Sequence, residues 1–164
     1  MLDPILNYPF FPLFRDSIWG ISYLTIILIF HGTAINHVYM HFENLTRNNL
    51  KLGQYNRVFF HFYVTFVLIA MIHILEILFW SIFLLRLDLI DKPIDALIFA
   101  GSCYTTVGFA ADTLREGWKS LAFFISFSGL FSLAWTTSIM IGMTGAYKSA
   151  WNQKYGRTTS EDEK

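Results

Sequence analysis

The sequence predicts an all-α membrane protein with three spanning helices and one short re-entrant helix. Of its 164 residues, 54% are hydrophobic and 15% are charged, whereas a soluble domain carries about 25% charged residues. The apolar residues are gathered into three long runs, and a fourth run of about 12 residues is too short to cross a bilayer. These three observations predict the fold class.

Each long run exceeds the roughly 20 helical residues that cross about 30 Å of hydrocarbon. The predicted spans lie at about 18–40, 57–85 and 118–146. A polar linker, "HFENLTRNNLKLGQYNR", separates the first two spans, and a polar tail follows the third. No repeat and no separate soluble domain is evident, so the chain is predicted to form one membrane domain.

The short run, "PIDALIFAGSCY" at 93–104, predicts a helix of about 18 Å, which is half a membrane. Asp91 is placed to cap this helix, and Pro93 fits its first turn. The polar stretch that follows, "TTVGFAAD", must return to the same side of the membrane. Irregular backbone at that depth is tolerated only where protein buries it or where it lines a water-filled cavity.

Such a loop has the chemistry of a cation path. A cation that sheds water needs oxygen ligands, and a run of backbone carbonyls at Thr106, Val107, Gly108 and Phe109 supplies them without fixed charge. Gly108 permits unusual backbone angles, and the negative end of the half-helix favours a cation. One loop forms only one wall of a path, so four copies are implied.

The residues also carry a family resemblance. "TTVGFAAD" resembles the potassium-channel signature Thr-Thr-Val-Gly-Tyr-Gly-Asp, and "DALIFAGSCYTTVGF" resembles a whole pore helix with its filter. The flanking "HILEILFW" and "EGWKSLAFFISFSGLFSLAWTTSIM" resemble small bacterial members of the two-helix-pore ion-channel family. The resemblance implies a homotetrameric, potassium-selective channel. Its permeant monovalent cation would bind at 106–109, with Thr105, Ala110, Ala111 and Asp112 supporting the filter, and it would need no other metal or cofactor.

The outer end of the loop departs from the family pattern. Phe109 stands in place of tyrosine, Ala110 in place of the second glycine, and one extra residue precedes Asp112. If the outermost carbonyl requires a positive φ, alanine opposes it by about 1 kcal/mol or more in each subunit. The alternative hypothesis is therefore a non-conducting or weakly selective channel-like protein, such as a haem- or metal-binding or accessory subunit.

Small residues recur along the third span, and Gly129 is the candidate hinge of a pore-lining helix. Ordinary packing of small residues is the alternative, and it is preferred for Gly142 and Gly145.

Ionisable residues at membrane depth are candidate functional groups. His31 and His73 lie about 13 and 11 residues from the outer ends of their spans, so they are expected to share a level, with Glu76 one turn from His73. Three interpretations compete. The first is a buried pair, in which a histidine donates to Glu76 or Glu76 bonds the pore helix from behind; the others are proton-linked gating and a haem or metal site. A second level is expected from His37, His41 and His61.

Lysine and arginine residues set the expected orientation. The linker and the tail together carry seven of them, against five on the other side. This bias predicts a cytoplasmic C-terminus and an external N-terminus. The resemblance to bacterial channels implies that the membrane is a bacterial inner membrane. The net charge is zero, which gives no basic surface for nucleic acid. The expected partners are the bilayer, further copies of the chain and an unknown regulatory membrane protein.

Enzymatic activity is not expected, because no nucleophile–base pair lies at a predicted membrane surface. Cys103 is the only cysteine, so it forms no disulfide within the chain. The predicted organisation is an interfacial segment at 1–17, the first span and linker at 18–56, a pore domain at 57–146 and a cytoplasmic tail at 147–164.

Overall fold

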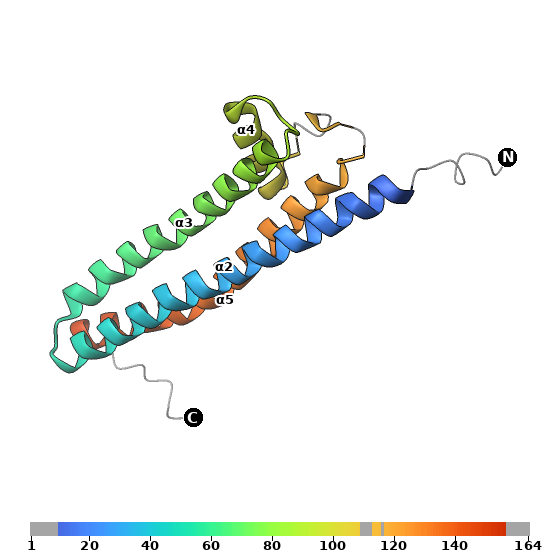
Figure 1. Ribbon diagram of the computed structural model, residues 1–164. Helices are drawn as coiled ribbons and strands as arrows, with labels where there is room; N and C mark the ends of the chain where they lie inside the picture. Colours follow the sequence, from blue (N-terminus) through green and yellow to red (C-terminus); the bar gives the residue numbers. More distant parts are fainter. Residues whose placement is uncertain (1–9, 109–112, 116, 157–164) are drawn as a thin grey trace. The chain divides into compact units, whose positions relative to one another are not determined.

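The computed structural model describes residues 10–108, 113–115 and 117–156. Within these residues the chain is all-helical, with four α-helices and no strand (Figure 1). The helices are α2 (Phe10–Lys51), α3 (Tyr55–Arg86), α4 (Pro93–Tyr104) and α5 (Ser120–Tyr155). The prediction of an all-α fold is therefore confirmed.

Helices α2, α3 and α5 are long and apolar enough to cross a membrane. Helix α3 agrees with the predicted second span, but α2 and α5 are longer than predicted. Helix α2 begins inside the predicted interfacial segment and continues through most of the predicted linker to Lys51. Neither glycine nor proline interrupts residues 33–52, and Arg47 pairs with Glu43 one turn away at 3.1 Å. Polarity alone therefore does not end this helix.

The ends of α2 and α3 follow the same backbone pattern. After α2, Gly53 takes φ +66°, while its N–H and that of Gln54 bond back to the carbonyls of Leu50 and Asn49 at 3.1 and 2.8 Å. After α3, Asp88 takes φ 49° in the corresponding place. A residue in the left-handed region with two such returning bonds satisfies carbonyls that the helix leaves unpaired.

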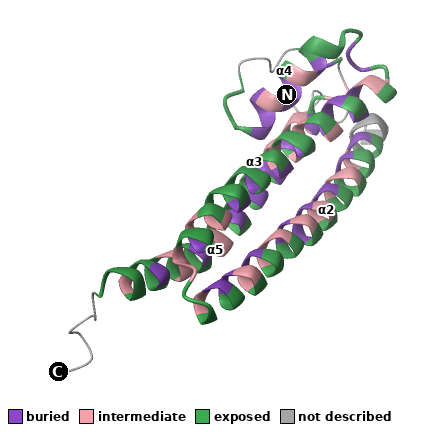
Figure 2. Ribbon diagram, turned by 90° about the vertical axis from the view of Figure 1, so that its left-hand side faces the viewer, coloured by how far each residue is buried: buried purple, intermediate pink, exposed green. Residues whose placement is uncertain are grey.

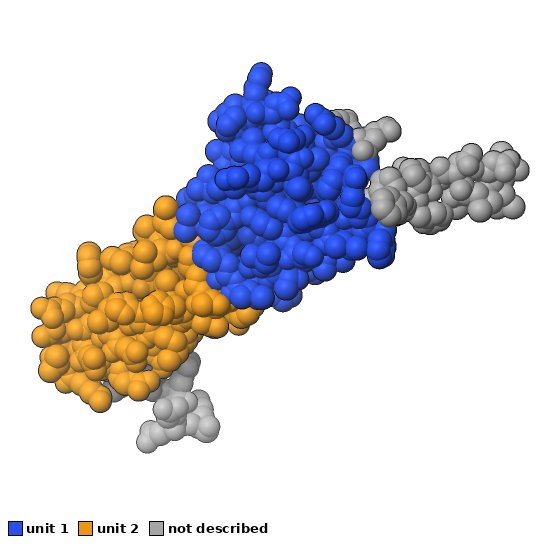
Figure 3. Space-filling view, viewed as in Figure 1, with its two compact units in different colours: residues 1–31, 73–132 blue, residues 32–72, 133–164 orange. Residues whose placement is uncertain are grey.

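The described residues divide into two compact units (Figure 3). Unit 1 contains residues 1–31 and 73–132, and unit 2 contains residues 32–72 and 133–164. All of α4 belongs to unit 1. Its buried residues Ala96, Phe99, Ala100 and Cys103 recur at the spacing of one helix face. They pack in a core with Trp80 and Leu84 of α3, Leu121 and Ile125 of α5, and Ile27 of α2.

The start of α4 differs from the prediction in one respect. Its N-cap is Lys92, in extended conformation, and no side chain bonds to the cap, so Asp91 does not cap the helix. Pro93 occupies the first turn as predicted. Proline has no N–H to satisfy there and its fixed φ suits the position, so this helix start does not depend on a side-chain acceptor.

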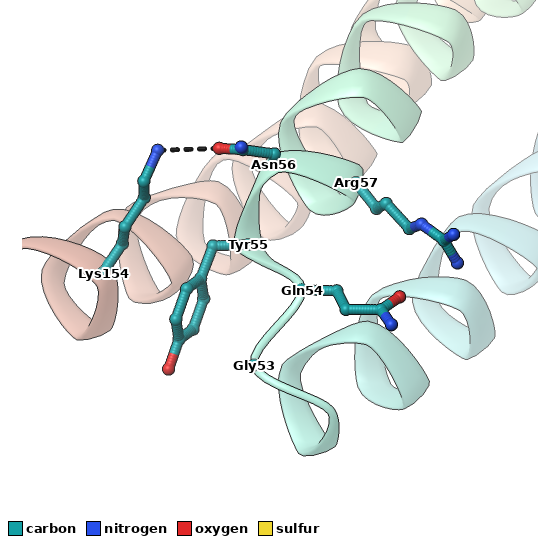
Figure 4. Close-up of a pocket in the computed structure, with 6 residues that line it drawn as sticks. All are labelled: Gly53, Gln54, Tyr55, Asn56, Arg57 and Lys154. Atoms are coloured by element: carbon teal, nitrogen blue, oxygen red, sulfur yellow. Dashed lines mark hydrogen bonds between the residues drawn. The ribbon is translucent and has the colours of Figure 1, made fainter.

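Unit 2 has its own core, formed by Ile35, Phe42, Val58, Ile69 and Met143. Near the turn between α2 and α3, Lys154 of α5 donates to the Asn56 side chain at 2.7 Å (Figure 4). The ring of Phe59 lies under the same ammonium group, 5.6 Å from its centroid. Trp151 and Tyr147 stack beside it. Such a group of aromatic and basic side chains is typical of a membrane–water interface.

Much of the outward surface of the helices is exposed in the single chain (Figure 2), and many of the exposed residues are large and apolar. On α3 the exposed ones include a series spaced every three or four residues, at Phe60, Val64, Val67, Met71, Leu75, Leu78 and Ile82. A soluble monomer rarely exposes so continuous an apolar stripe. The chain is therefore compatible with a membrane protein whose helices face lipid or other subunits.

Asp16 fastens the start of α5 to α2 within unit 1. Its buried carboxylate accepts from the backbone N–H of Ser120 at 3.2 Å and from the Ser120 hydroxyl. Asp16→Ala is expected to lower the free energy of unfolding by about 1–2 kcal/mol, because the first turn of α5 loses its acceptor. Ser17→Ala, at the next position, is the control. Equal thermal unfolding midpoints for the two variants in detergent would contradict this role.

Candidate functional site

The predicted filter begins where α4 ends. Helix α4 stops at Tyr104, and Thr105, Thr106, Val107 and Gly108 follow as an exposed, non-helical segment. Val107 is 66% exposed in the single chain. The other residues predicted for this loop, Phe109, Ala110, Ala111 and Asp112, lie outside the described residues.

The backbone of this segment is tied to the last turn of α4. The N–H groups of Thr105 and Gly108 donate to the carbonyls of Gly101 and Ser102, each at 3.0 Å. Thr106 and Gly108 take φ values of 61° and 69°. Unusual backbone angles were expected at Gly108, whereas the positive φ at Thr106 was not expected. At Thr106 it is strained for a β-branched residue, and such strain clusters at functional sites. The sequence gave no indication of this positive φ, because threonine rarely adopts it.

Behind the segment lies a buried polar cluster that joins three helices. His31 Nδ1 of α2 lies 2.6 Å from Glu76 Oε1 of α3, and both side chains are fully buried. The Tyr104 hydroxyl of α4 donates to Glu76 Oε2 at 2.6 Å. His73 Nδ1 lies 2.8 Å from the same hydroxyl. The structure thus brings together His31, His73 and Glu76, which sequence reasoning had placed at one level.

Tyr104 is the member that sequence reasoning missed. It is the only tyrosine of α4 and directly precedes the threonine pair, which was a signal that a hydroxyl could project from the end of the helix. Both parts of the buried-pair interpretation occur together, because Glu76 is hydrogen-bonded to His31 and also accepts from Tyr104 at the end of α4.

The cluster also has the ligand types of a transition-metal site. One ligand atom from each of His31, His73 and Glu76 lies within 4.8 Å of the others, and two imidazoles with a carboxylate suit zinc-class ions. The imidazole centroids are 5.4 Å apart. A haem held between them would require the helices to separate, because Glu76 and Tyr104 already bridge the two rings.

Gly129 of α5 touches the end of α4. A methyl group built on Gly129 would overlap the carbonyl oxygen of Tyr104 and lie 2.8 Å from its carbonyl carbon. Helix α5 is α-helical through this point. The absence of a side chain at Gly129 therefore allows two backbones to approach closely. Its role as a hinge stays a prediction.

The second set of histidines lies in unit 2. His37, His41 and His61 line one cavity between α2 and α3, and apolar side chains such as Val38 and Val64 complete the lining. The structure thus groups these three residues as expected. The apolar lining gives them few polar neighbours there.

No family model, no curated protein and no solved structure matches the chain. What the site can do follows from its own chemistry. It combines an exposed non-helical segment after Tyr104 with a buried hydrogen-bonded cluster that holds the end of α4.

Proposed function

We propose that the chain is the subunit of a homotetrameric cation channel, selective for potassium, in a bacterial inner membrane. Ions would pass along the backbone carbonyls of Thr106, Val107, Gly108 and Phe109. The proposal depends on one observation. Helix α4, which is too short to span a membrane, ends at Tyr104 against Glu76 of α3, and the exposed Thr-Thr-Val-Gly segment follows it.

The depth follows from the contacts of Tyr104. Its hydroxyl bonds Glu76, which lies ten residues before the end of α3 at Arg86. Ten helical residues rise about 15 Å, which is half the thickness of the hydrocarbon core. This distance supports a re-entrant α4 whose C-terminal end lies near the middle of the membrane.

The backbone of the segment also supports an ion path. Positive φ at alternate residues, Thr106 and Gly108, changes the direction of successive peptide planes. This is the type of backbone adjustment needed to turn carbonyls toward a common axis, where they replace the water shell of a cation. The exposed Val107 side chain leaves the segment open to contact with other copies.

Four copies are proposed because a single segment surrounds nothing. Exposed carbonyls and an exposed valine at membrane depth are costly unless protein or a water-filled path covers them. In a ring of four segments, neighbouring copies would cover the valine side chains and the carbonyls would line a water-filled path. The exposed apolar face of α5, which includes Phe127, Leu130 and Leu133, is available for the contacts between subunits or with lipid.

Reconstitution tests the proposal directly. Purified protein in detergent is expected to have four times the mass of one chain, by light scattering corrected for bound detergent. In liposomes it is expected to pass K⁺ and Rb⁺ faster than Na⁺ at some pH between 5 and 8, roughly the range over which histidine titrates. A monomer, or a tetramer that passes none of these ions under an imposed gradient, would overturn the channel proposal.

A second candidate is a metal-binding membrane subunit that does not conduct. The convergence of ligand atoms from His31, His73 and Glu76 within 4.8 Å favours it. Purified protein would then show visible absorption on adding Co²⁺, or a Soret band if haem is bound, and His31→Ala would abolish the signal. A colourless protein that conducts would exclude this candidate.

A further inference from the structure

The buried cluster has a defined direction of hydrogen bonding. The Tyr104 hydroxyl gives its one proton to Glu76, so its oxygen accepts from His73 Nδ1–H. If Glu76 is a carboxylate it can only accept, and His31 Nδ1–H then donates to its other oxygen. The tautomers of both rings are assigned from this network.

Glu76 therefore bridges two helices. One carboxylate oxygen accepts from α2 through His31, and the other accepts from α4 through Tyr104. Hydrogen bonds to a buried carboxylate are short and strong, and removing one partner leaves a charge poorly compensated. The orientation of Glu76, and hence of Tyr104, depends on His31 of the first span.

Tyr104 is held on its other side by its own backbone. Its carbonyl lies against Gly129 of α5, and the amides of Thr105 and Gly108 bond to the carbonyls of the last turn of α4. The hydroxyl's bonds to Glu76 and His73 are therefore a further restraint on the last turn of α4, and through it on the segment from Thr105 to Gly108.

We propose that His31 and Glu76 are positioning residues, which set the geometry of the Thr105–Gly108 segment through Tyr104. Helices α3 and α5 flank α4 in the sequence, and α2 does not. Through His31, α2 would nevertheless help to support the proposed filter. This inference rests on the proposed channel function for its electrical consequence, but its structural consequence is independent of conduction.

Tyr104→Phe is the direct test, because it removes the hydroxyl's bonds to Glu76 and His73 and keeps the ring. The matched control is Tyr23→Phe, which removes a 2.8 Å bond between α2 and the Phe79 carbonyl of α3 in the same unit. In reconstituted tetramers, Tyr104→Phe is expected to lower the K⁺/Na⁺ permeability ratio about tenfold, and Tyr23→Phe to leave it unchanged.

A second pair tests His31. His31→Leu removes the donor at similar volume, whereas His31→Asn can place an amide N–H where Nδ1 lies. The leucine variant is expected to lose selectivity as Tyr104→Phe does, and the asparagine variant to retain most of it. Equal loss of thermal stability in Tyr104→Phe and Tyr23→Phe, with unchanged permeability ratios in all four variants, would show that the cluster only stabilises the fold and would overturn the proposal.

Hydrogen–deuterium exchange separates this proposal from the channel proposal. The amides of Thr105, Thr106 and Gly108 are expected to exchange about tenfold faster in Tyr104→Phe than in Tyr23→Phe, because the last turn of α4 loses its anchor. This result would support the positioning role even if the wild-type protein passes no ions. If Tyr104→Phe leaves the exchange rates unchanged and the wild-type protein passes no ions, both the positioning role and the channel proposal are wrong.

Discussion

Gly108→Ala is expected to abolish potassium-selective flux. Gly108 has φ +69°, a region in which alanine costs about 1–2 kcal/mol. Four copies would line one path, so the costs sum to about 4 kcal/mol or more, which is roughly a thousandfold in the population of the conducting backbone. Rubidium uptake by liposomes and reversal potentials in planar bilayers measure the loss.

Gly53→Ala is the matched control for that experiment. Gly53 has φ +66° in the turn after α2, and a methyl group there, as at Gly108, meets no atom within 4 Å. Both substitutions therefore carry the same backbone penalty without a steric clash in the single chain. If the two variants conduct equally well and with equal selectivity, Gly108 does not line the path and the proposed filter is wrong.

Local sequence signals were sufficient to predict α4 and α3. The apolar run begins at Pro93, which favours the first turn of a helix, and ends at Tyr104, just before the polar pair Thr105–Thr106. The structure gives α4 the same bounds. Helix α3 has no internal proline or glycine, and it differs from the prediction by two residues at its start and one at its end. Where composition changes sharply, the helix bounds could be predicted.

The lengths of α2 and α5 were underestimated. The predicted spans counted only apolar residues, whereas a helix can continue through polar residues that do not break it. Residues 43–51 are mostly polar and still helical. The prediction placed the end of the helix where polarity begins. The structure ends the helix at Lys51, just before Gly53, whose positive φ and the hydrogen bonds that return there satisfy the last carbonyls.

The site was predictable only in part. Counting residues from the ends of two antiparallel spans placed His31 and His73 together, because helical rise is regular. The same counting could not show that Tyr104 would reach Glu76, since this contact depends on the packing of α4 against α3. It also could not distinguish a hinge at Gly129 from a close approach of two backbones.

Gly129→Ala addresses that last distinction and is expected to have the second largest effect. An added methyl group would overlap the Tyr104 carbonyl oxygen, which belongs to the backbone and cannot rotate away. Overpacking of this kind costs about 1–3 kcal/mol. The end of α4 would be pushed from α5, so thermal stability and potassium selectivity are both expected to fall.

Gly145→Ala is the control in the same helix. A methyl group at Gly145 meets no atom within 4 Å, and alanine stabilises a helix interior by about 1 kcal/mol relative to glycine. The two variants should therefore shift the unfolding midpoint in opposite directions. If Gly129 serves only as a hinge, Gly129→Ala would instead raise stability as Gly145→Ala does, while changing how often the channel opens. If both unfolding midpoints rise, the close contact between Gly129 and the Tyr104 carbonyl does not constrain the proposed filter.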